Sequence, residues 1–218
     1  MSTLRRIRAA LVRARRFTSS PDYWERHYAA GGTSGGGSYG RVADFKADFL
    51  NRLVAERDVR SVVEWGCGDG NQLSLARYPS YLGLDVSRTA VELCRTRFAG
   101  DPTRSFELVD SLPTREQAGR VRADLAMSLD VIYHLIEQEV FERHLQALFE
   151  SADRLVVIFA VDEDRPVTAA HVLFRSFTGL VAREQPEWSL VDRQPCPYPN
   201  TGDDLSGSDA EFFVYERK

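Results

Sequence analysis

Hydrophobic and polar positions follow two different periods along the chain, and the change between them falls near residue 60. Before that point, an interval close to 3.6 residues separates Val42, Phe45, Phe49, Leu50 and Leu53, which predicts an amphipathic helix. After it, short apolar runs alternate with helical segments. We predict strands at 61–65, 81–86, 105–109, 123–129 and 155–161, and helices at 71–78, 88–99, 114–120 and 137–151. Strands that alternate with helices of this length imply a parallel sheet with helices on both faces.

The two ends of the chain follow other patterns. A helical stretch near 167–183 precedes two strand-like runs, EWSLVDRQ and AEFFVYER, which a loop rich in Pro, Asn, Gly and Asp separates. Near the N-terminus, Ser20-Pro21 marks a helix start with Asp22 and Glu25 in its first turn, and the glycines between residues 31 and 40 predict a loop. We therefore divide the chain into residues 1–55, a basic leader followed by an aromatic and glycine-rich cap segment, and residues 56–218, the core.

Composition and charge narrow the classes of protein to which the chain can belong. The 218 residues carry a formal net charge of -4, which gives no support for a nucleic-acid partner. No run approaches the roughly 20 apolar residues of a membrane-spanning helix. Cys67, Cys94 and Cys196 are widely spaced, so neither a disulfide framework nor a zinc site is indicated, and a reducing cytoplasm is the simpler location. No pattern sets the oligomeric state.

The first residues, MSTLRRIRAALVRARRF, have two interpretations. One is a basic amphipathic helix that makes weak contact with a membrane surface or an acidic partner. The other is a solvated leader, since chain termini are often disordered.

Three glycines, Gly66, Gly68 and Gly70, directly follow the strand predicted at 61–65. Glycine permits positive φ and lets the backbone approach a ligand closely, and ligands of open α/β sheets bind beyond the carboxyl ends of the strands. A dinucleotide fingerprint would need a third glycine where Asn71 stands, and a P-loop would need Lys and Ser/Thr after its second glycine. A tight structural corner with no ligand is the alternative.

The stretch VVEWGCGDG resembles the first motif of class I S-adenosylmethionine-dependent methyltransferases. Glu64 and the three glycines fill every fixed position of that motif, with Cys67 between the first two glycines. The resemblance covers residues 60–161, and the two last strands match the closing hairpin of the family. It implies an α/β fold: a Rossmann-like, seven-stranded, mostly parallel sheet with helices on both faces and a C-terminal antiparallel hairpin. It also implies S-adenosyl-L-methionine as cofactor and no metal.

The resemblance also implies which residues contact the cofactor. Asp85, at the end of the second strand, would accept hydrogen bonds from both ribose hydroxyls; its alternative role is to cap the next helix with Ser87. Asp110 and Ser111 match the adenine-binding position, although they are also ordinary loop residues. The full expected set is Glu64, Gly66, Cys67, Gly68, Gly70, Asn71, Asp85, Val86, Asp110, Ser111 and Asp130.

Catalytic and substrate-binding residues are expected from the remaining segments. His134 would be a general base near the methyl donor, or would only pack beneath it. His171 is the alternative base, and it would share a helix face with Arg175, four residues away. The cap segment would act as a lid that contributes aromatic side chains to the sulfonium site, or would serve only as a linker. The expected lid and substrate residues are Tyr23, Trp24, Tyr28, Tyr39, Arg41 and Arg175.

We therefore expect a methyltransferase that acts on a small-molecule or saccharide-like acceptor, with oxygen slightly preferred to nitrogen. The fourth predicted strand ends in SLDV, which lacks the Asn-Pro-Pro-Tyr signature of relatives that methylate nucleobases or glutamine. Three alternatives stay open at this point: an N-methyltransferase of a small molecule or peptide, a nucleotide-binding oxidoreductase, and a non-catalytic regulator that binds S-adenosylmethionine.

Overall fold

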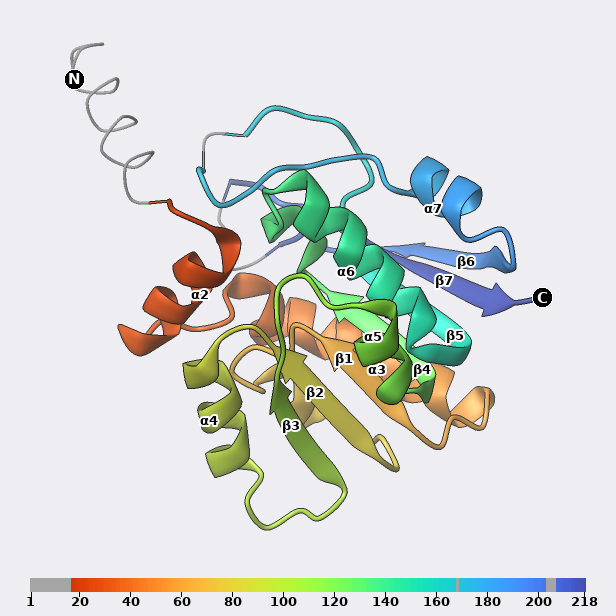
Figure 1. Ribbon diagram of the computed structural model, residues 1–218, viewed down its shortest axis with the longest axis horizontal. Helices are drawn as coiled ribbons and strands as arrows, with labels where there is room; N and C mark the ends of the chain where they lie inside the picture. The colour runs from red at the N-terminus through yellow and green to blue at the C-terminus, as the bar shows by residue number, and fades with distance from the viewer. Residues whose placement is uncertain (1–16, 168, 203–206) are drawn as a thin grey trace.

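A seven-stranded sheet runs through the centre of the molecule in the strand order β3-β2-β1-β4-β5-β7-β6 (Figure 1). The structure, a computed structural model, describes residues 17–167, 169–202 and 207–218, so the basic leader predicted at the N-terminus lies outside the described residues. The strands are β1 (Val62–Trp65), β2 (Tyr81–Asp85), β3 (Arg104–Leu108), β4 (Ala123–Leu129), β5 (Ala152–Ala160), β6 (Trp188–Pro195) and β7 (Glu211–Arg217). The first five are parallel, whereas β7 is antiparallel to both β5 and β6. The fold class expected from the sequence is confirmed.

Helices cover both faces of this sheet. α3 (Gly40–Glu56) and α4 (Arg88–Arg97) pack on one face, and α5 (Arg115–Arg120), α6 (Gln138–Glu150) and α7 (Thr178–Glu184) pack on the other. In Figure 1, α5 and α6 lie in front of the sheet and α3 lies behind it. α2 (Ser20–Ala29) lies apart from both layers, at the edge of the molecule near the start of α4.

The alternation of side chains along the strands explains the two layers. Val62 belongs to the apolar cluster beneath α3, and its neighbour Val63 belongs to the cluster beneath α6, because successive strand residues point to opposite faces. α3 buries Val42, Phe49, Leu50 and Leu53, which share one face of the helix, and the ring of Phe49 stacks on Phe212 of β7 with centroids 4.0 Å apart. The amphipathic helix predicted from that spacing is therefore confirmed.

One predicted helix is much shorter in the structure. Instead of a helix at 71–78, only a 3-10 helix forms, at Gln72–Leu75. The side chain of Asn51 on α3 donates to the Leu75 carbonyl (3.0 Å) and accepts from the Arg77 amide (2.7 Å). These bonds occupy backbone groups that a continuing helix would need, so the prediction of a full helix is wrong.

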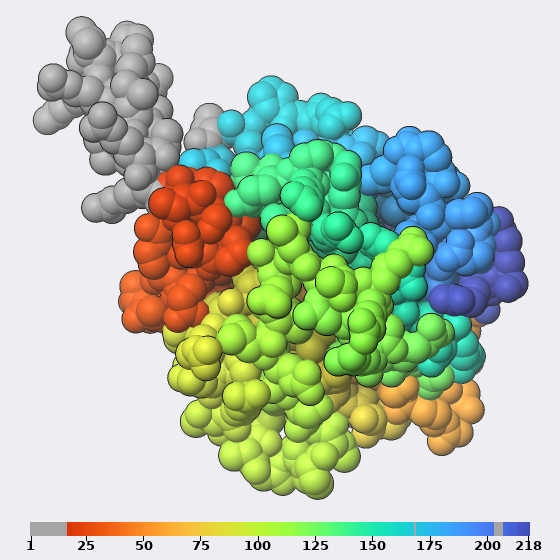
Figure 2. Space-filling view, in the orientation of Figure 1, coloured from red at the N-terminus to blue at the C-terminus, as the bar shows by residue number. Residues whose placement is uncertain are grey.

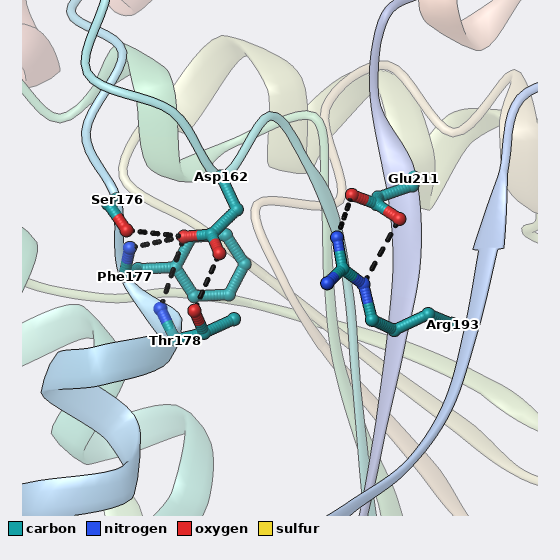
Figure 3. A network of polar contacts seen from close by, with 6 residues as sticks. All are labelled: Asp162, Ser176, Phe177, Thr178, Arg193 and Glu211. Carbon is teal, nitrogen blue, oxygen red and sulfur yellow. Dashed lines mark hydrogen bonds and ion pairs between the residues drawn. The ribbon is translucent and has the colours of Figure 1, made fainter.

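A second correction concerns the helix predicted near 167–183. Of the described residues there, only α7 (Thr178–Glu184) is helical, because Asp162 at the end of β5 fixes where that helix begins (Figure 3). Its carboxylate accepts from the amides of Phe177 and Thr178 and from the hydroxyls of Ser176 and Thr178. The segment before α7 is irregular, so the expectation that His171 and Arg175 share a helix face is wrong.

The closing hairpin is held by side chains as well as by its ladder. Arg193 of β6 forms a two-point ion pair with Glu211 of β7 (Figure 3). The Arg193 guanidinium also lies 4.8 Å from the ring centroid of Phe213. The register of β6 on β7 shifts between Leu190 and Asp192, which marks a bulge in this edge strand.

Candidate active site

A cavity opens at the carboxyl ends of β1, β2, β3 and β4, under the cap segment. The order of the strands places the residues at their carboxyl ends in one row: Asp110 after β3, Asp85 at the end of β2, Gly66 after β1 and Asp130 after β4. The predicted site residues that line the cavity are Trp24, Tyr28, Glu64, Gly66, Cys67, Gly68, Asp85, Val86, Asp110, Ser111, Asp130 and His134. The other predicted residues, which lie outside this lining, are Tyr23, Tyr39, Arg41, Gly70, Asn71, His171 and Arg175.

The glycine turn needs glycine for two separate reasons. Gly66, Gly68 and Gly70 all have positive φ, at 90°, 56° and 73°, where a side chain would be strained. A Cβ atom at Gly66 would also collide with Val131, and one at Gly68 would collide with Ser34 of the cap segment. The close approach that the glycines allow in this structure is therefore that of neighbouring protein segments.

Asp85 is buried and connects the glycine turn to α4. Its two carboxylate oxygens accept from the amides of Gly68 (2.9 Å) and Ser87 (2.8 Å), and the Ser87 hydroxyl in turn accepts from Ala90 in the first turn of α4. Burial raises the pKa of Asp85 to about 6, although these amide hydrogen bonds act against the rise. Each carboxylate oxygen can accept further hydrogen bonds, so the group can still bind two hydroxyls.

Glu64, at the start of the motif, is also buried. It accepts a short hydrogen bond from the Tyr81 hydroxyl (2.5 Å). Burial raises the pKa of Glu64 to about 7, against the opposing effects of the Tyr81 hydrogen bond and the charge of Lys46. The two buried carboxyl groups of the cavity, Glu64 and Asp85, therefore have raised pKa values, and Glu64 is only partly ionised near neutral pH.

Lys46 on α3 also lines the cavity, and the sequence analysis did not include it. Its ammonium group is completely buried and donates to Asp130 (2.6 Å), whose other oxygen accepts from the Tyr133 hydroxyl (2.8 Å). Asp130 has a φ of 60°, which is uncommon outside glycine and occurs often at functional sites. The sequence contains one signal that could have drawn attention to Lys46. It is one of only two lysines, with Lys218, among the 28 lysines and arginines of the chain.

Two further residues of the cavity were missed. Gln72 in the 3-10 helix after the glycine turn donates to the Ala43 carbonyl (3.1 Å). His144 on α6 forms a hydrogen bond with the Ser128 hydroxyl (2.9 Å), and burial lowers the pKa of its imidazole to about 4. Neither residue belongs to a sequence motif, and each reaches the cavity only because its helix packs beside the sheet.

His134 lines the cavity from the 3-10 helix Ile132–His134, which follows β4. Its Nδ1 lies 2.9 Å from the backbone carbonyl of His171, so Nδ1 carries the proton and the lone pair is on Nε2. The indole of Trp24 meets the imidazole edge to face, with centroids 4.8 Å apart. Burial lowers the pKa of His134 to about 4, so the imidazole is neutral at physiological pH.

The cap segment, residues 17–39, is attached to the core at three places. Ser20 bonds to the Glu137 carboxylate, and Glu25 accepts from Ser87 and Thr89 at the start of α4. The third attachment is at Asp69 in the glycine turn, which accepts from the Ser34 amide and the Tyr39 hydroxyl. Figure 2 shows α2, in red, lying directly against the green and cyan segments of the core.

The predicted residues outside the lining have other contacts. Tyr23 stacks on His171 with centroids 4.4 Å apart, and Asn71 donates to the Ser38 carbonyl of the cap segment. The Arg41 guanidinium lies 4.7 Å from the ring centroid of Tyr198. Arg175 donates to the carbonyls of Leu135 and Ile136, and thereby joins the segment before α7 to the segment after β4.

Comparison with known proteins assigns this fold and site to a family. Residues 40–196 match the methyltransferase domain family, whereas no curated protein matches the sequence. The chain belongs to this family and is a class I S-adenosylmethionine-dependent methyltransferase. S-adenosylmethionine is its cofactor, and the family is one of methyltransferases, not of oxidoreductases.

Solved structures share the fold at low sequence identity. A SAM-dependent methyltransferase from Anabaena variabilis is 15% identical with a TM-score of 0.67, over 91% of this chain and 95% of that one. N-methyltransferase NodS from Bradyrhizobium japonicum is 16% identical with a TM-score of 0.61, over 81% and 87%. Magnesium protoporphyrin IX methyltransferase from Synechocystis is 15% identical with a TM-score of 0.61, over 82% and 85%. At these identities the likeness concerns the fold.

The donor set of the cavity fits S-adenosylmethionine. Asp85 can accept hydrogen bonds from ribose hydroxyls in addition to those it accepts within the protein. Near α3, the buried Gln72 Oε1 atom has no hydrogen-bond partner among the described residues and can accept a hydrogen bond from a ligand. Within the same described ranges, no three His, Cys, Asp or Glu side chains are grouped so that they could hold a metal ion. Likewise, no described helix is long and apolar enough to cross a membrane.

Proposed function

We propose that this methyltransferase acts on a small-molecule or saccharide-like acceptor and transfers the methyl group to oxygen. The observation that carries this proposal is the cap segment: Trp24, Tyr28, Ser34 and Ser38 line the cavity, and Ser34 packs directly against the glycine turn. A site roofed in this way favours a small acceptor, or the end of a saccharide, over an extended polymer lying on an open surface. The net charge of -4 also disfavours a nucleic acid.

In this proposal the adenosine half of the cofactor lies along the row of strand ends. Asp85 accepts from the ribose hydroxyls, Asp110 and Ser111 face the adenine, and Val86 lies beside it, while the turn at Gly66 lies nearer the sulfonium. S-adenosylmethionine supplies the electrophilic methyl group. The remaining contribution of the chain is to align the acceptor with it and to exclude water, which the aromatic residues of the cap segment favour.

His134 is the proposed catalytic residue on the acceptor side. Its neutral imidazole has a lone pair on Nε2, which can accept a hydrogen bond from an acceptor hydroxyl and take its proton as the new bond to carbon forms. This low pKa keeps the imidazole unprotonated at neutral pH, so Nε2 is available to accept that proton. His171 is the less favoured base, because its ring lies outside the cavity lining and its carbonyl orients His134.

N-methylation of a small molecule or a peptide is the second candidate. It is favoured by the structural likeness to an N-methyltransferase, which shares the fold over 81% of this chain. For either acceptor we place the protein in the cytoplasm, a proposal supported by the three free cysteines, Cys67, Cys94 and Cys196.

The test is a panel of acceptors incubated with S-adenosylmethionine labelled in the methyl group. The panel pairs hydroxylated small molecules and saccharides with amines and peptides of similar size, and mass spectrometry locates the label. We expect label on oxygen, and we expect His134→Gln to lower turnover at least tenfold while binding of 5′-methylthioadenosine is unchanged. Label on nitrogen would show that the acceptor atom is nitrogen and would contradict the proposed O-methylation. Full turnover by His134→Gln would show that His134 is not the catalytic base.

A further inference from the structure

Lys46 is an unusual residue for this chain. The other positive charges are almost all arginines, yet Lys46, one of only two lysines in the sequence, is fully buried at 0% exposure. A buried ammonium group is unfavourable unless it is paired and hydrogen-bonded. Its position on α3 is one helical turn after Ala43, so Lys46 and the carbonyl that binds Gln72 lie on the same side of the helix.

The contacts of Lys46 within the protein leave capacity for a ligand. An ammonium group has three N–H donors, and among the described residues only the Asp130 carboxylate accepts a hydrogen bond from it. The side chain lines the cavity, with the ring of Phe159 5.3 Å from Nζ on the other side. Asp130 balances the charge, so the pair is neutral before any ligand arrives.

Gln72 supplies the complementary group. It is 8% exposed and lines the same cavity, and its Oε1 atom is buried with no hydrogen-bond partner among the described residues. A buried, unsatisfied acceptor is costly and rare, and it requires an explanation. A ligand with N–H donors at this place would satisfy it.

We infer that Lys46 and Gln72 bind the amino-acid end of the cofactor, with Lys46 on its carboxylate and Gln72 Oε1 on its ammonium group. A zwitterion needs donors and an acceptor side by side, and these two residues provide them. The order of the strands supports the location, since Asp130 and its partner Lys46 lie at the β4 end of the row and Asp110 and Asp85 lie at the β3 and β2 end. This inference rests on the proposed placement of adenosine along that row.

Two ligands allow binding at the adenosine half and at the amino-acid half of the site to be measured separately. S-adenosylhomocysteine carries the amino-acid end, whereas 5′-methylthioadenosine carries adenosine and sulfur without it. For Lys46→Met we expect at least a tenfold loss of affinity for S-adenosylhomocysteine by calorimetry and less than a twofold change for 5′-methylthioadenosine. Gln72→Leu should show the same selectivity. The matched control is Asp85→Ala, which should weaken both ligands equally.

Removing Lys46 alone leaves Asp130 buried and unpaired, so a double variant, Lys46→Met with Asp130→Asn, keeps the site neutral and guards against unfolding. Retained binding of 5′-methylthioadenosine reports that the adenosine half is intact. The inference is overturned if the Lys46 variants lose both ligands to the same extent, or neither. If the unmodified protein binds neither ligand, the proposed donor site itself is wrong, which is a distinguishable outcome.

Discussion

At the scale of single residues, Asp85 has two roles that use the same carboxylate oxygens. Its carboxylate holds the Gly68 amide of the glycine turn and the Ser87 amide before α4, and in the proposed function it also accepts from the ribose hydroxyls. Because burial raises its pKa to about 6, this carboxyl group takes up a proton within an accessible pH range. A protonated carboxyl group has lost one acceptor, so binding of the cofactor should depend on its ionisation.

We expect the affinity for 5′-methylthioadenosine to be constant above pH 7 and to fall about tenfold between pH 7 and pH 5, one unit below the pKa of Asp85. This ligand has no amino-acid group that titrates in the range. Calorimetry at several pH values measures the effect, and Asp85→Asn should bind weakly and with no pH dependence in the range. An equal pH dependence in that variant would assign the titration to another group.

The site residues that could be foreseen are those in local motifs. Glu64, the three glycines and Asp85 form a pattern within 22 consecutive positions. Lys46 was not foreseen because its partner Asp130 lies 84 residues away, and the two meet only when α3 packs beside β4. Gln72 was not predicted for a related reason. Its proposed role rests on a buried side-chain oxygen without a hydrogen-bond partner among the described residues, which only the packed structure shows.

At the scale of elements, the segment between β5 and α7 is held at both ends by polar contacts. Asp162 binds the start of α7, and the Leu173 amide donates to the Tyr133 carbonyl (2.8 Å) near the cavity. His171, whose carbonyl lies 2.9 Å from Nδ1 of His134, is two residues before Leu173 in the same segment. One irregular segment therefore contacts both the start of α7 and the surroundings of His134.

Asp162→Ala removes four hydrogen bonds at the start of α7. We expect the free energy of unfolding to fall by about 1–2 kcal/mol, as for the loss of a helix cap. Urea unfolding followed by circular dichroism measures this, with Glu163→Ala at the exposed neighbouring position as the matched control. An equal effect of both substitutions would contradict a specific cap at Asp162.

The strands were predictable because buried parallel strands are apolar runs bounded by polar residues, and each of the five lies within three residues of its predicted bounds. Helical spacing alone was misleading in TAAHVLFRSFTGLV, where contacts with distant residues decide the structure. Asp162 sets the start of α7, and Arg175 donates to carbonyls of the segment after β4. Neither contact leaves a periodic signal.

At the scale of the whole molecule, the cap segment and the core enclose the cavity between them. The cap is attached at the glycine turn, at α4 and at the segment after β4, so it contacts the structures on three sides of the site. Its role as a lid remains a prediction. If the cap opens to admit ligands, then a contact whose residues all lie outside the cavity lining should control opening without removing a residue of the site itself.

Glu25 provides that contact, since it accepts from Ser87 and Thr89, lies outside the cavity lining and is partly exposed. The hydrogen bonds from Ser87 and Thr89 lower its pKa, so it is ionised at neutral pH. We expect Glu25→Ala to speed hydrogen exchange in residues 20–39 and dissociation of S-adenosylhomocysteine about fivefold each, the factor for a loss of about 1 kcal/mol. Glu56→Ala, exposed at the end of α3, is the control. Faster exchange without faster dissociation would mean that the cap does not gate the ligand, and unchanged exchange would mean that Glu25 does not hold the cap closed.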